Sequence, residues 1–484
     1  MNSNEIAALA PIMTLAASAV AVMLIIACKR NFVVISSVAA CGLIATLAAV
    51  AITWKQAAVQ ATLLLRLDEY AVFYTLVLLL TALSVMGFCY DYFKQRDGEN
   101  EELFLLLLTA TLGACVLVAS SHFSSFFIGL EILSISLFVL IGYPLTQARP
   151  LEAAIKYLIL SGVSSALLLM GMALIYAQTG TLYFSSLGQF IASHSTMNTM
   201  ILSGIILLVA GLSFKLSLVP FHLWTPDIYE GAPAPIAGFI ATVSKGAVFV
   251  LLLRFFISTD SHLYTPLFTV FSVIAVFSIL GGNLLALLQT NVKRLLAYSS
   301  IAHMGYLMVA FIAGANRLPA LAVEAFTYYL VAYFITTLGA FGVVSVLSTP
   351  DYEAGDMALY RGLFWQRPWL AGVFTLMLLS LAGIPLTAGF IGKFYIFTSG
   401  ADSRLWGLLF TVIAGSGIGL YYYLKIIVVM SMNFEDAVLK AEKPSSQWIS
   451  MVTLGLLSIL LIWFGIYPDY LVNLIQSISE TKIK

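Results

Sequence analysis

Three lysines lie inside stretches of the sequence that are otherwise apolar, namely Lys215, Lys245 and Lys393. On membrane-insertion scales, each would cost about 2.5–3.5 kcal/mol at the centre of a bilayer. One of them could be a buried structural charge, but the combined cost of three favours an ion or proton path. Burial can bring the pKa of a lysine towards neutrality, whereas an arginine keeps its proton. Lysine is therefore the basic residue that a proton path requires.

Glu131 is a carboxylate within another apolar stretch, SFFIGLEILSISLF. It could lie near the membrane edge, neutral or bonded to water. We favour a partner for a buried lysine, because a nearby opposite charge favours the charged amine while burial favours the neutral amine. A carboxylate that moved relative to the lysine would then make the amine exchange its proton.

Two histidines could pass protons between these groups, since imidazole titrates near neutral pH. His222 follows Lys215 by seven residues, and it could instead be a hydrogen-bonded core residue. His303 has Ser299 and Ser300 on the same expected helix, and their hydroxyl groups could form a proton wire with it. We favour a relay role for both histidines.

Prolines interrupt the chain next to two of the lysines. The stretch Gly211–Pro235 reads GLSFKLSLVPFHLWTPDIYEGAPAP. Its Pro220 lacks an amide hydrogen and clashes with the preceding helical turn. Residues 382–398 read AGIPLTAGFIGKFYIFT, with Pro385 ahead of Lys393. Paired interruptions in corresponding positions indicate a transporter built from inverted repeats.

Two carboxylates, Asp227 and Glu230, follow the first interruption. They are expected at the cytoplasmic end of the broken helix. They are either solvated loop residues or an entrance that collects protons, and the sequence favours neither interpretation.

The elements that must position these residues are membrane-spanning helices. The chain of 484 residues is 61% hydrophobic and only 10% charged, whereas soluble domains carry about 25% charged residues. Because a helix needs about 20 apolar residues to cross a bilayer, the sequence predicts an all-α polytopic membrane protein with about 14 transmembrane helices. These are expected at residues 6–28, 32–53, 70–91, 103–121, 123–143, 153–177, 200–224, 234–257, 265–288, 295–315, 320–347, 369–398, 404–432 and 448–474.

Charge in the loops predicts the orientation of these helices. Lys and Arg are more frequent in the loops of one side, for example around Arg30 and Arg96, than in those of the other. The positive-inside rule then places both the N-terminus and the C-terminus outside. The formal net charge is zero, so no nucleic-acid partner is indicated.

Spans four to eight and spans nine to thirteen form two groups of five helices. Lys215 and Lys393 lie on the fourth helix of their groups, and Glu131 and His303 lie on the second. Because five is odd, two such copies must be inverted relative to each other in the membrane. The expected regions are residues 1–102 with helices one to three, 103–257 with the first repeat, 258–432 with the second repeat and 433–484 with helix fourteen.

The sequence contains no phosphate-binding loop, haem signature or iron–sulfur set of cysteines. The spacing of Cys28, Cys41, Cys89 and Cys115 fits neither a metal site nor a disulfide framework, so we interpret them as small core residues. Moving one proton outward against 100 mV costs about 2.3 kcal/mol. A partner or a second ion must therefore supply the energy.

The stretch KLSLVPFHLWTPD, from Lys215 to Asp227, and the GAPAP that follows resemble the central signature of the antiporter-like subunits of respiratory complex I and of related cation/proton antiporters. The resemblance extends over nearly the whole chain. It includes GLEILS around Glu131, TVSKGAVF around Lys245, NVKRLLAYSSIAHMGY around His303 and SLAGIPLTAGFIGKFY around Lys393.

Two features distinguish the chain within this family. The M-type subunit carries glutamate on the twelfth span, where this chain has Lys393. The L-type subunit continues past fourteen spans into a long lateral helix, whereas this sequence stops at Lys484. We therefore expect neither of these two types.

The resemblance implies roles for four residues. In the family, a glutamate of span five and lysines of spans seven, eight and twelve form a charged axis in mid-membrane, and the matching positions are Glu131, Lys215, Lys245 and Lys393. Two half-channels joined laterally are implied, one on each repeat. FMN, iron–sulfur clusters and quinone are expected in partner subunits, with no cofactor or metal in this chain. The implied partners are other membrane-arm subunits, including an M-type neighbour, and the lipids of a bacterial inner membrane.

We therefore expect a proton-translocating subunit of NADH–quinone oxidoreductase. The alternatives are a subunit of a sodium/proton antiporter, driven by ion exchange, and a membrane scaffold without a path of its own. Neighbouring genes would separate the first two, because NADH-dehydrogenase genes and antiporter genes form different clusters. A scaffold would tolerate apolar replacements at all four axis residues.

Overall fold

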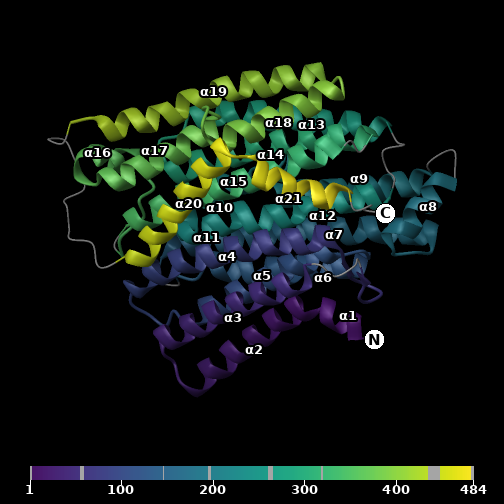
Figure 1. Ribbon diagram of the computed structural model, residues 1–484, viewed down its shortest axis with the longest axis horizontal. Coiled ribbons are helices and arrows are strands. Elements are labelled where there is room, and N and C mark those ends of the chain that lie inside the picture. Colours follow the sequence, from purple (N-terminus) through teal and green to yellow (C-terminus); the bar gives the residue numbers. More distant parts are fainter. Residues whose placement is uncertain are drawn as a thin grey trace.

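A computed structural model describes residues 3–54, 59–144, 147–193, 198–259, 265–317, 320–350, 352–433 and 447–480. Most of these residues belong to helices that run side by side along the longest axis of the molecule (Figure 1). A short antiparallel pair of two-residue strands, β1 (Val59–Gln60) and β2 (Arg66–Leu67), lies in the connection between the third and fourth helices.

The helices of the N-terminal half begin and end as follows: α1 (Ser3–Ala8), α2 (Ala10–Cys28), α3 (Phe32–Thr53), α4 (Glu69–Lys94), α5 (Glu102–Ala119), α6 (Phe123–Ile141), α7 (Ala148–Thr179), α8 (Phe184–Ser193), α9 (Thr199–Leu216), α10 (Trp224–Gly231), α11 (Ala234–Phe239), the π-helical η1 (Ile240–Ser244) and α12 (Lys245–Ser258).

The helices of the C-terminal half are α13 (Thr265–Leu287), α14 (Val292–Arg317), α15 (Ala320–Leu347), the 3₁₀ helix η3 (Met357–Tyr360), α16 (Leu363–Gln366), α17 (Pro368–Ala382), α18 (Ala388–Asp402), α19 (Trp406–Ser431), α20 (Trp448–Ile466) and α21 (Asp469–Glu480).

Within the described residues, 13 helices are long and apolar enough to cross a membrane. The remaining predicted span, 369–398, is divided between α17 and α18, neither of which reaches that length. The all-α polytopic class is therefore confirmed. Each predicted group of five helices contains one interrupted helix, α9–α10 in the first and α17–α18 in the second. The half-turn that would relate the two groups, and the four regions built on it, stay a prediction.

The last predicted span, 448–474, is wrong at its C-terminal end. Helix α20 ends at Ile466, and α21 begins only at Asp469. Pro468 lies between them and cannot donate the amide hydrogen that a continuous helix needs. The apolar run is therefore divided into a membrane helix and a second helix that follows it.

The centre of the bundle consists of α12, α14 and α15, which are almost completely buried in the chain itself. Peripheral helices such as α2, α3, α7 and α19 instead expose large apolar side chains, for example Phe410 at 74% and Ile52 at 77%. Such a surface suits lipid tails. The two exposed cysteines, Cys28 and Cys41, lie on these outer helices, so they are not the core residues that we predicted.

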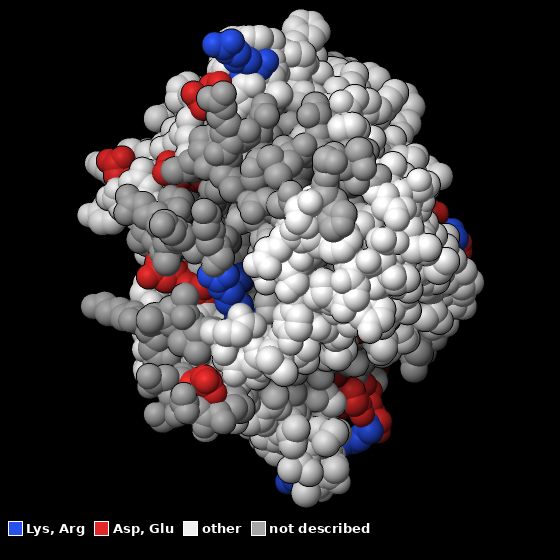
Figure 2. All heavy atoms as spheres, turned by 90° about the vertical axis from the view of Figure 1, so that its right-hand side faces the viewer, with Lys and Arg blue, Asp and Glu red and all other residues white. Residues whose placement is uncertain are grey.

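The N-terminus and the C-terminus lie towards the same end of the bundle (Figure 1). Among the described residues at that end, charged groups of both signs lie scattered among other atoms (Figure 2). Its described loops include Arg66 and Arg404. Lys55, Lys440, Lys443, Lys482 and Lys484, which entered the prediction of orientation, lie outside the described residues.

Candidate functional site: a buried axis of titratable side chains

The first interruption, between α9 and α10, is closed by specific hydrogen bonds. Helix α9 ends where Ser217 adopts a left-handed conformation at φ 61°, three residues before Pro220. The indole of Trp224 donates to the Phe214 carbonyl at 2.9 Å, and Thr225 donates to Ser217 at 2.6 Å. Freed backbone groups at membrane depth need such partners. The predicted break at Pro220 is therefore present and is stabilised by side chains.

The second interruption follows α17. Gly383 ends this helix with φ 87°, and its amide donates to the Leu379 carbonyl. A Cβ atom on Gly383 would lie 2.8 Å from the Lys393 side chain, so glycine is needed for the turn and for this close approach. Pro385 lies in the turn, and α18 begins at Ala388.

Lys215 lies in the last turn of α9 and is only 6% exposed. Its ammonium group donates to Ser134 of α6 at 2.7 Å and to Ser161 of α7 at 2.6 Å. The ring of Tyr157 lies 5.9 Å away. Hydroxyl groups of two neighbouring helices thus replace the water that the ammonium group loses on burial.

Glu131 lies one turn before Ser134 on α6 and accepts a hydrogen bond from Ser165 at 2.5 Å. No ion pair joins it to Lys215 among the described residues. The two groups are therefore neighbours across a layer of serine hydroxyl groups.

Lys245 directly follows the π-helical turn η1 and is fully buried. Its ammonium group donates to Ser300 of α14 at 2.8 Å, and Ser300 is hydrogen-bonded to Tyr333 of α15 at 2.7 Å. The ring of Tyr229 lies 5.2 Å from the ammonium group. Short π-helical turns often mark functional sites, but our sequence analysis expected a regular helix here.

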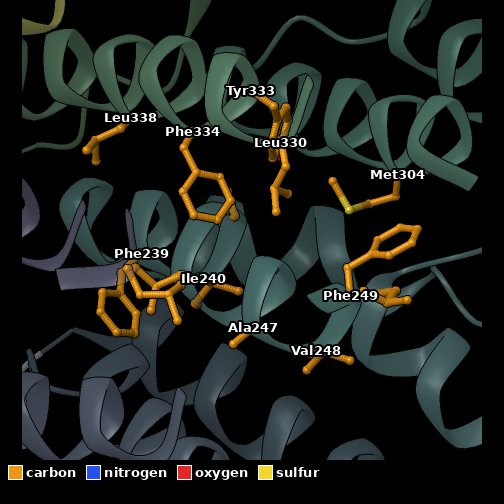
Figure 3. Packing of buried hydrophobic residues seen from close by; sticks show 14 of the residues in the cluster. Phe239, Ile240, Ala247, Val248, Phe249, Met304, Leu330, Tyr333, Phe334 and Leu338 are labelled. Carbon is orange, nitrogen blue, oxygen red and sulfur yellow. The ribbon is translucent and has the colours of Figure 1, made fainter. Parts of the chain in front are cut away.

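Beside this lysine, α11, η1 and the first turn of α12 pack closely against α15. Figure 3 shows Phe334 and Leu338 of α15 facing Phe239 and Ile240. A Cβ atom on Gly246 would lie 2.1 Å from the Phe334 ring, so only glycine permits this approach. The packing fixes the depth at which Lys245 meets α14 and α15.

His303 is 3% exposed and has a partner on each ring nitrogen. Nδ1 lies 2.6 Å from the hydroxyl group of Tyr329, and Nε2 lies 3.2 Å from that of Tyr423. We expected Ser299 and Ser300 to form a wire with this histidine. Ser299 is connected to His303 through Tyr423, whose hydroxyl group is hydrogen-bonded to both, whereas Ser300 is hydrogen-bonded to Lys245 and Tyr333.

Lys393 lies on α18 and reaches back across the interruption. Its ammonium group donates to the carbonyl groups of Leu381 and Ala382, each at 2.9 Å, which end α17. The negative end of a helix dipole favours a cation at this position. The ring of Tyr306 lies 5.2 Å from the ammonium group.

These contacts connect Lys245 with Lys393 through side chains. The rings of Tyr333 and His303 lie 5.4 Å apart, and the ring of Tyr306, which faces Lys393, lies 5.5 Å from that of His303. On the other side, the ring of Tyr157 lies beside Lys215 and the ring of Tyr229 beside Lys245. We call the set Glu131, Lys215, Lys245, His303 and Lys393 the buried axis, although Glu131 and Lys393 are only half-buried.

His222 lies in the first interruption, buried except for 9% of its surface. Its Nδ1 atom has no hydrogen-bond partner among the residues described. The structure thus places this histidine beside the broken helix, with one nitrogen free to bind water.

Asp227 and Glu230 lie on α10, at the end opposite to the termini, and both are paired. Arg294 donates to each at 2.8 Å, and Lys156 donates to Asp227 at 3.1 Å. Partial burial disfavours the charge, but the bonds from Arg294 and Lys156 lower the pKa of Asp227 below its ordinary value. This carboxylate therefore stays ionised at neutral pH.

Two further buried cations escaped our sequence analysis. Lys293 lies between two predicted spans and Arg254 near the outer end of the predicted span 234–257, yet they are 0% and 2% exposed. Lys293 lies in the first turn of α14 beside Glu353, and Arg254 forms a bidentate pair with Asp68. Their only signal in the sequence was their position at the edge of an apolar run.

Helices interrupted at two positions, with a buried lysine at the first and a half-buried lysine at the second, define a class of ion-translocating membrane proteins. In the described part of the chain, no cluster of three or more His, Cys, Asp or Glu residues could hold a metal ion. The arrangement can hold and pass protons, because amines, an imidazole and hydroxyl groups alternate in it.

Residues 120–419 match the family model described as NADH:quinone oxidoreductase/Mrp antiporter, transmembrane. The chain belongs to this family. NADH-quinone oxidoreductase subunit N of Methylococcus capsulatus is 49% identical over 430 residues, which cover 89% of this chain and 87% of that protein.

Solved structures agree with this assignment. A chain of respiratory complex I from Thermus thermophilus is 31% identical and superposes with a TM-score of 0.82, over 96% of this chain and 98% of that chain. The fold alone is shared with a chain of an archaeal membrane-bound sulfane sulfur reductase, at 23% identity and a TM-score of 0.87, over 99% of this chain and 98% of that chain. The fold alone is likewise shared with a chain of the Mrp complex from a Dietzia species, at 18% identity and a TM-score of 0.86, over 100% of this chain and 98% of that chain.

Proposed function

We propose that this chain is the N-type, proton-translocating membrane-arm subunit of an NADH–quinone oxidoreductase. The observation that carries the proposal is the buried axis, in which three lysines inside the membrane part are held by hydroxyl or carbonyl groups. The identity of 49% to a subunit N supports the same function. A scaffold would have no use for three lysines inside apolar runs, two of them buried within the chain, because each costs energy to insert.

In this proposal, Lys215, Lys245 and Lys393 bind and release the translocated protons. Glu131 sets how tightly Lys215 holds its proton. His303 passes protons between Lys245 and Lys393, and His222 does so at the first interruption. Asp227 and Glu230 attract protons at the inner surface, and the breaks at Pro220 and Pro385 let the half-helices adjust.

Electron transfer supplies the energy and takes place elsewhere. FMN, the iron–sulfur clusters and the quinone belong to partner subunits, and an M-type antiporter-like subunit is a direct neighbour. The chain lies in the inner membrane of a bacterium, with both termini on the periplasmic side. A conformational change in the neighbours would shift Glu131 relative to Lys215 and so start the transfer.

Purification of the tagged chain from native membranes tests the assembly. Recovery of NADH dehydrogenase subunits is expected, whereas recovery of sodium/proton antiporter subunits alone would contradict the proposal. The activity test uses Lys215→Ala and Lys215→Arg in membrane vesicles, with dye quenching for pumping and native gels for assembly. We expect both variants to assemble and both to pump less, because arginine cannot release its proton. Normal pumping by Lys215→Ala would remove Lys215 from the mechanism.

A further inference from the structure

Lys293 is a second kind of buried amine, close to the inner end of the bundle. It is fully buried, and its ammonium group donates to the Ala232 carbonyl at 2.6 Å and to Glu353 at 3.1 Å. Buried ion pairs add little to stability, since desolvation offsets their attraction. Stability alone therefore does not explain why an ion pair is buried at this position.

Glu353 connects Lys293 with the inner solvent. Its side chain is 24% exposed, and its Oε2 atom accepts hydrogen bonds from Lys293 and from Ser348. Its Oε1 atom is buried, lies 3.7 Å from Arg96 and has no hydrogen-bond partner among the described residues. The backbone beside Glu353 lies against the start of α14, because Val292 donates to the Gly355 carbonyl at 2.6 Å. The carboxylate thus lies between water and the buried amine. Glu230, Arg96 and Arg149 also act on Lys293 electrostatically.

Helix α14 connects this pair with the buried axis. Ser300, which binds Lys245, follows Lys293 by seven residues. Two helical turns place both residues on the same face, about 10.5 Å apart along the helix. Only side chains or water can bridge this distance for a proton.

Helix α15 runs antiparallel to α14 over the same stretch. The contacts of Ser300 with Tyr333 and of His303 with Tyr329 fix the alignment of the two helices. Thr337 follows Tyr333 by one turn in the direction of the inner end. It therefore lies at a depth between Ser300 and Lys293.

Two buried hydroxyl groups in this region lack a well-formed hydrogen bond within the described residues: Thr337 Oγ1, which lies near the hydroxyl group of Tyr333, and the phenolic oxygen of Tyr229, which lies near Ser300. Their residues are 3% and 0% exposed. Tyr229 contacts Phe341, one turn beyond Thr337 on α15, and its ring also faces Lys245. Buried hydroxyl groups nearly always have partners, and an internal water is the usual partner where protein atoms are missing.

We propose that Glu353 and Lys293 form the inner entrance for protons bound for Lys245, and that waters held by Thr337 and Tyr229 bridge the gap to Ser300. The inference rests on the proposed function and names the residues through which its protons enter from the inner side. Asp227 and Glu230 lie at the rim of this entrance, where Asn291 donates to Glu230 at 3.4 Å.

The proton balance of this path is simple. Glu353 takes a proton from inner water, and the carboxylic acid passes it to the first bound water. Each O–H bond that breaks along the waters is replaced by a new one, and an N–H bond forms on the neutral amine of Lys245. Lys293 keeps its proton and stabilises the carboxylate that remains.

The test compares two neighbouring threonines of α15. Thr337→Val removes a hydroxyl group that has no well-formed protein hydrogen bond, whereas Thr336→Val removes one that donates to the Ala332 carbonyl at 2.7 Å. If no water were bound here, Thr337→Val would have no effect, whereas Thr336→Val would lose a hydrogen bond. Because we propose a bound water at Thr337, we expect Thr337→Val to lower the number of protons pumped per NADH oxidised by the assembled complex. Thr336→Val should leave this number unchanged.

Tyr229→Phe and Glu353→Gln extend the test with isosteric changes, and both should also lower pumping per NADH. Thr337→Ser should restore it, because serine keeps the hydroxyl group. Wild-type pumping in assembled Thr337→Val and Tyr229→Phe would overturn the entrance. Lys245→Ala distinguishes failure of the proposed function from failure of the proposed entrance. Normal pumping by Lys245→Ala would refute the proposed function. Reduced pumping by Lys245→Ala together with full pumping by Thr337→Val would refute only the entrance.

Discussion

Glu131 and Lys215 are held by two serines that lie one turn apart on α7. Ser165 donates to Glu131 at 2.5 Å, and Lys215 donates to Ser161 at 2.6 Å. No ion pair joins the carboxylate to the amine in the described structure. A small shift of α6 along α7 would therefore change their separation without breaking an ion pair.

The first prediction treats these two residues as a unit. Glu131→Gln removes the negative charge that favours the charged amine, so Lys215 should hold its proton less tightly and pumping should fall. The double variant Glu131→Gln with Lys215→Ala should be little worse than Lys215→Ala alone, because residues that act together are non-additive. Pumping in the four proteins, normalised to assembled complex and electron input, measures this. Losses that simply add would mean that the two act separately.

The second prediction concerns the charge at the end of α17. Lys393→Glu would place a carboxylate against the carbonyl groups of Leu381 and Ala382, where the helix dipole is also negative. We expect this variant to assemble poorly, whereas Lys393→Met should assemble and lose only pumping. Native gels and vesicle acidification separate the two effects. Assembly of Lys393→Glu at or above the level of Lys393→Met would show that this site tolerates a negative charge.

The third prediction concerns the packing of the first turn of α12 on α15. Gly246→Ala would place its Cβ atom 2.1 Å from the Phe334 ring, and overpacking of this kind costs about 1–3 kcal/mol. We expect less assembled complex and a lower thermal midpoint. Phe334→Leu should partly restore the Gly246→Ala variant by making room. Gly417→Ala is the control, because a Cβ atom there meets nothing within 4 Å. Equal effects of both alanines would contradict the steric explanation.

The fourth prediction concerns the buried pair at the outer end. Arg254 donates to both carboxylate oxygens of Asp68, at 3.0 and 2.6 Å. Removing one partner of such a pair costs about 3–5 kcal/mol, so Asp68→Asn should lower the thermal midpoint of the complex. Glu102→Gln, which loses the more exposed pair with Arg30, should change the midpoint little.

The pH dependence of this pair follows from its charge state. Burial disfavours the Asp68 carboxylate, but Arg254 outweighs that effect and lowers the pKa of Asp68. Its stabilisation is then complete above the unfolded pKa of about 3.9 and is lost only as the pH falls through the lower, folded pKa. The difference between wild type and Asp68→Asn should therefore stay constant from about pH 5.5 to 8. A difference that shrinks within this range would mean that the carboxylate already takes up a proton there.

The sequence alone determined the membrane class, the approximate helices and the two interruptions. These features depend on local chemistry. Apolar runs of spanning length form helices in lipid wherever they occur, and Pro220 and Pro385 interrupt a helix whatever surrounds them. The lysines were recognisable for the same reason, since a charge within an apolar run is expensive in any fold. Pro468 carried the same signal, and our predicted last span overlooked it.

The contacts of each buried group depend on how distant helices pack together. Ser299 and Ser300 are adjacent in the chain, yet one binds Tyr423 of α19 and the other binds Lys245 of α12. Lys293 reads as a loop residue and is buried because the backbone around Glu353 packs over it. Such contacts join helices that are far apart in the chain. They depend on the packing of whole faces, which the periodicity of a single helix does not encode.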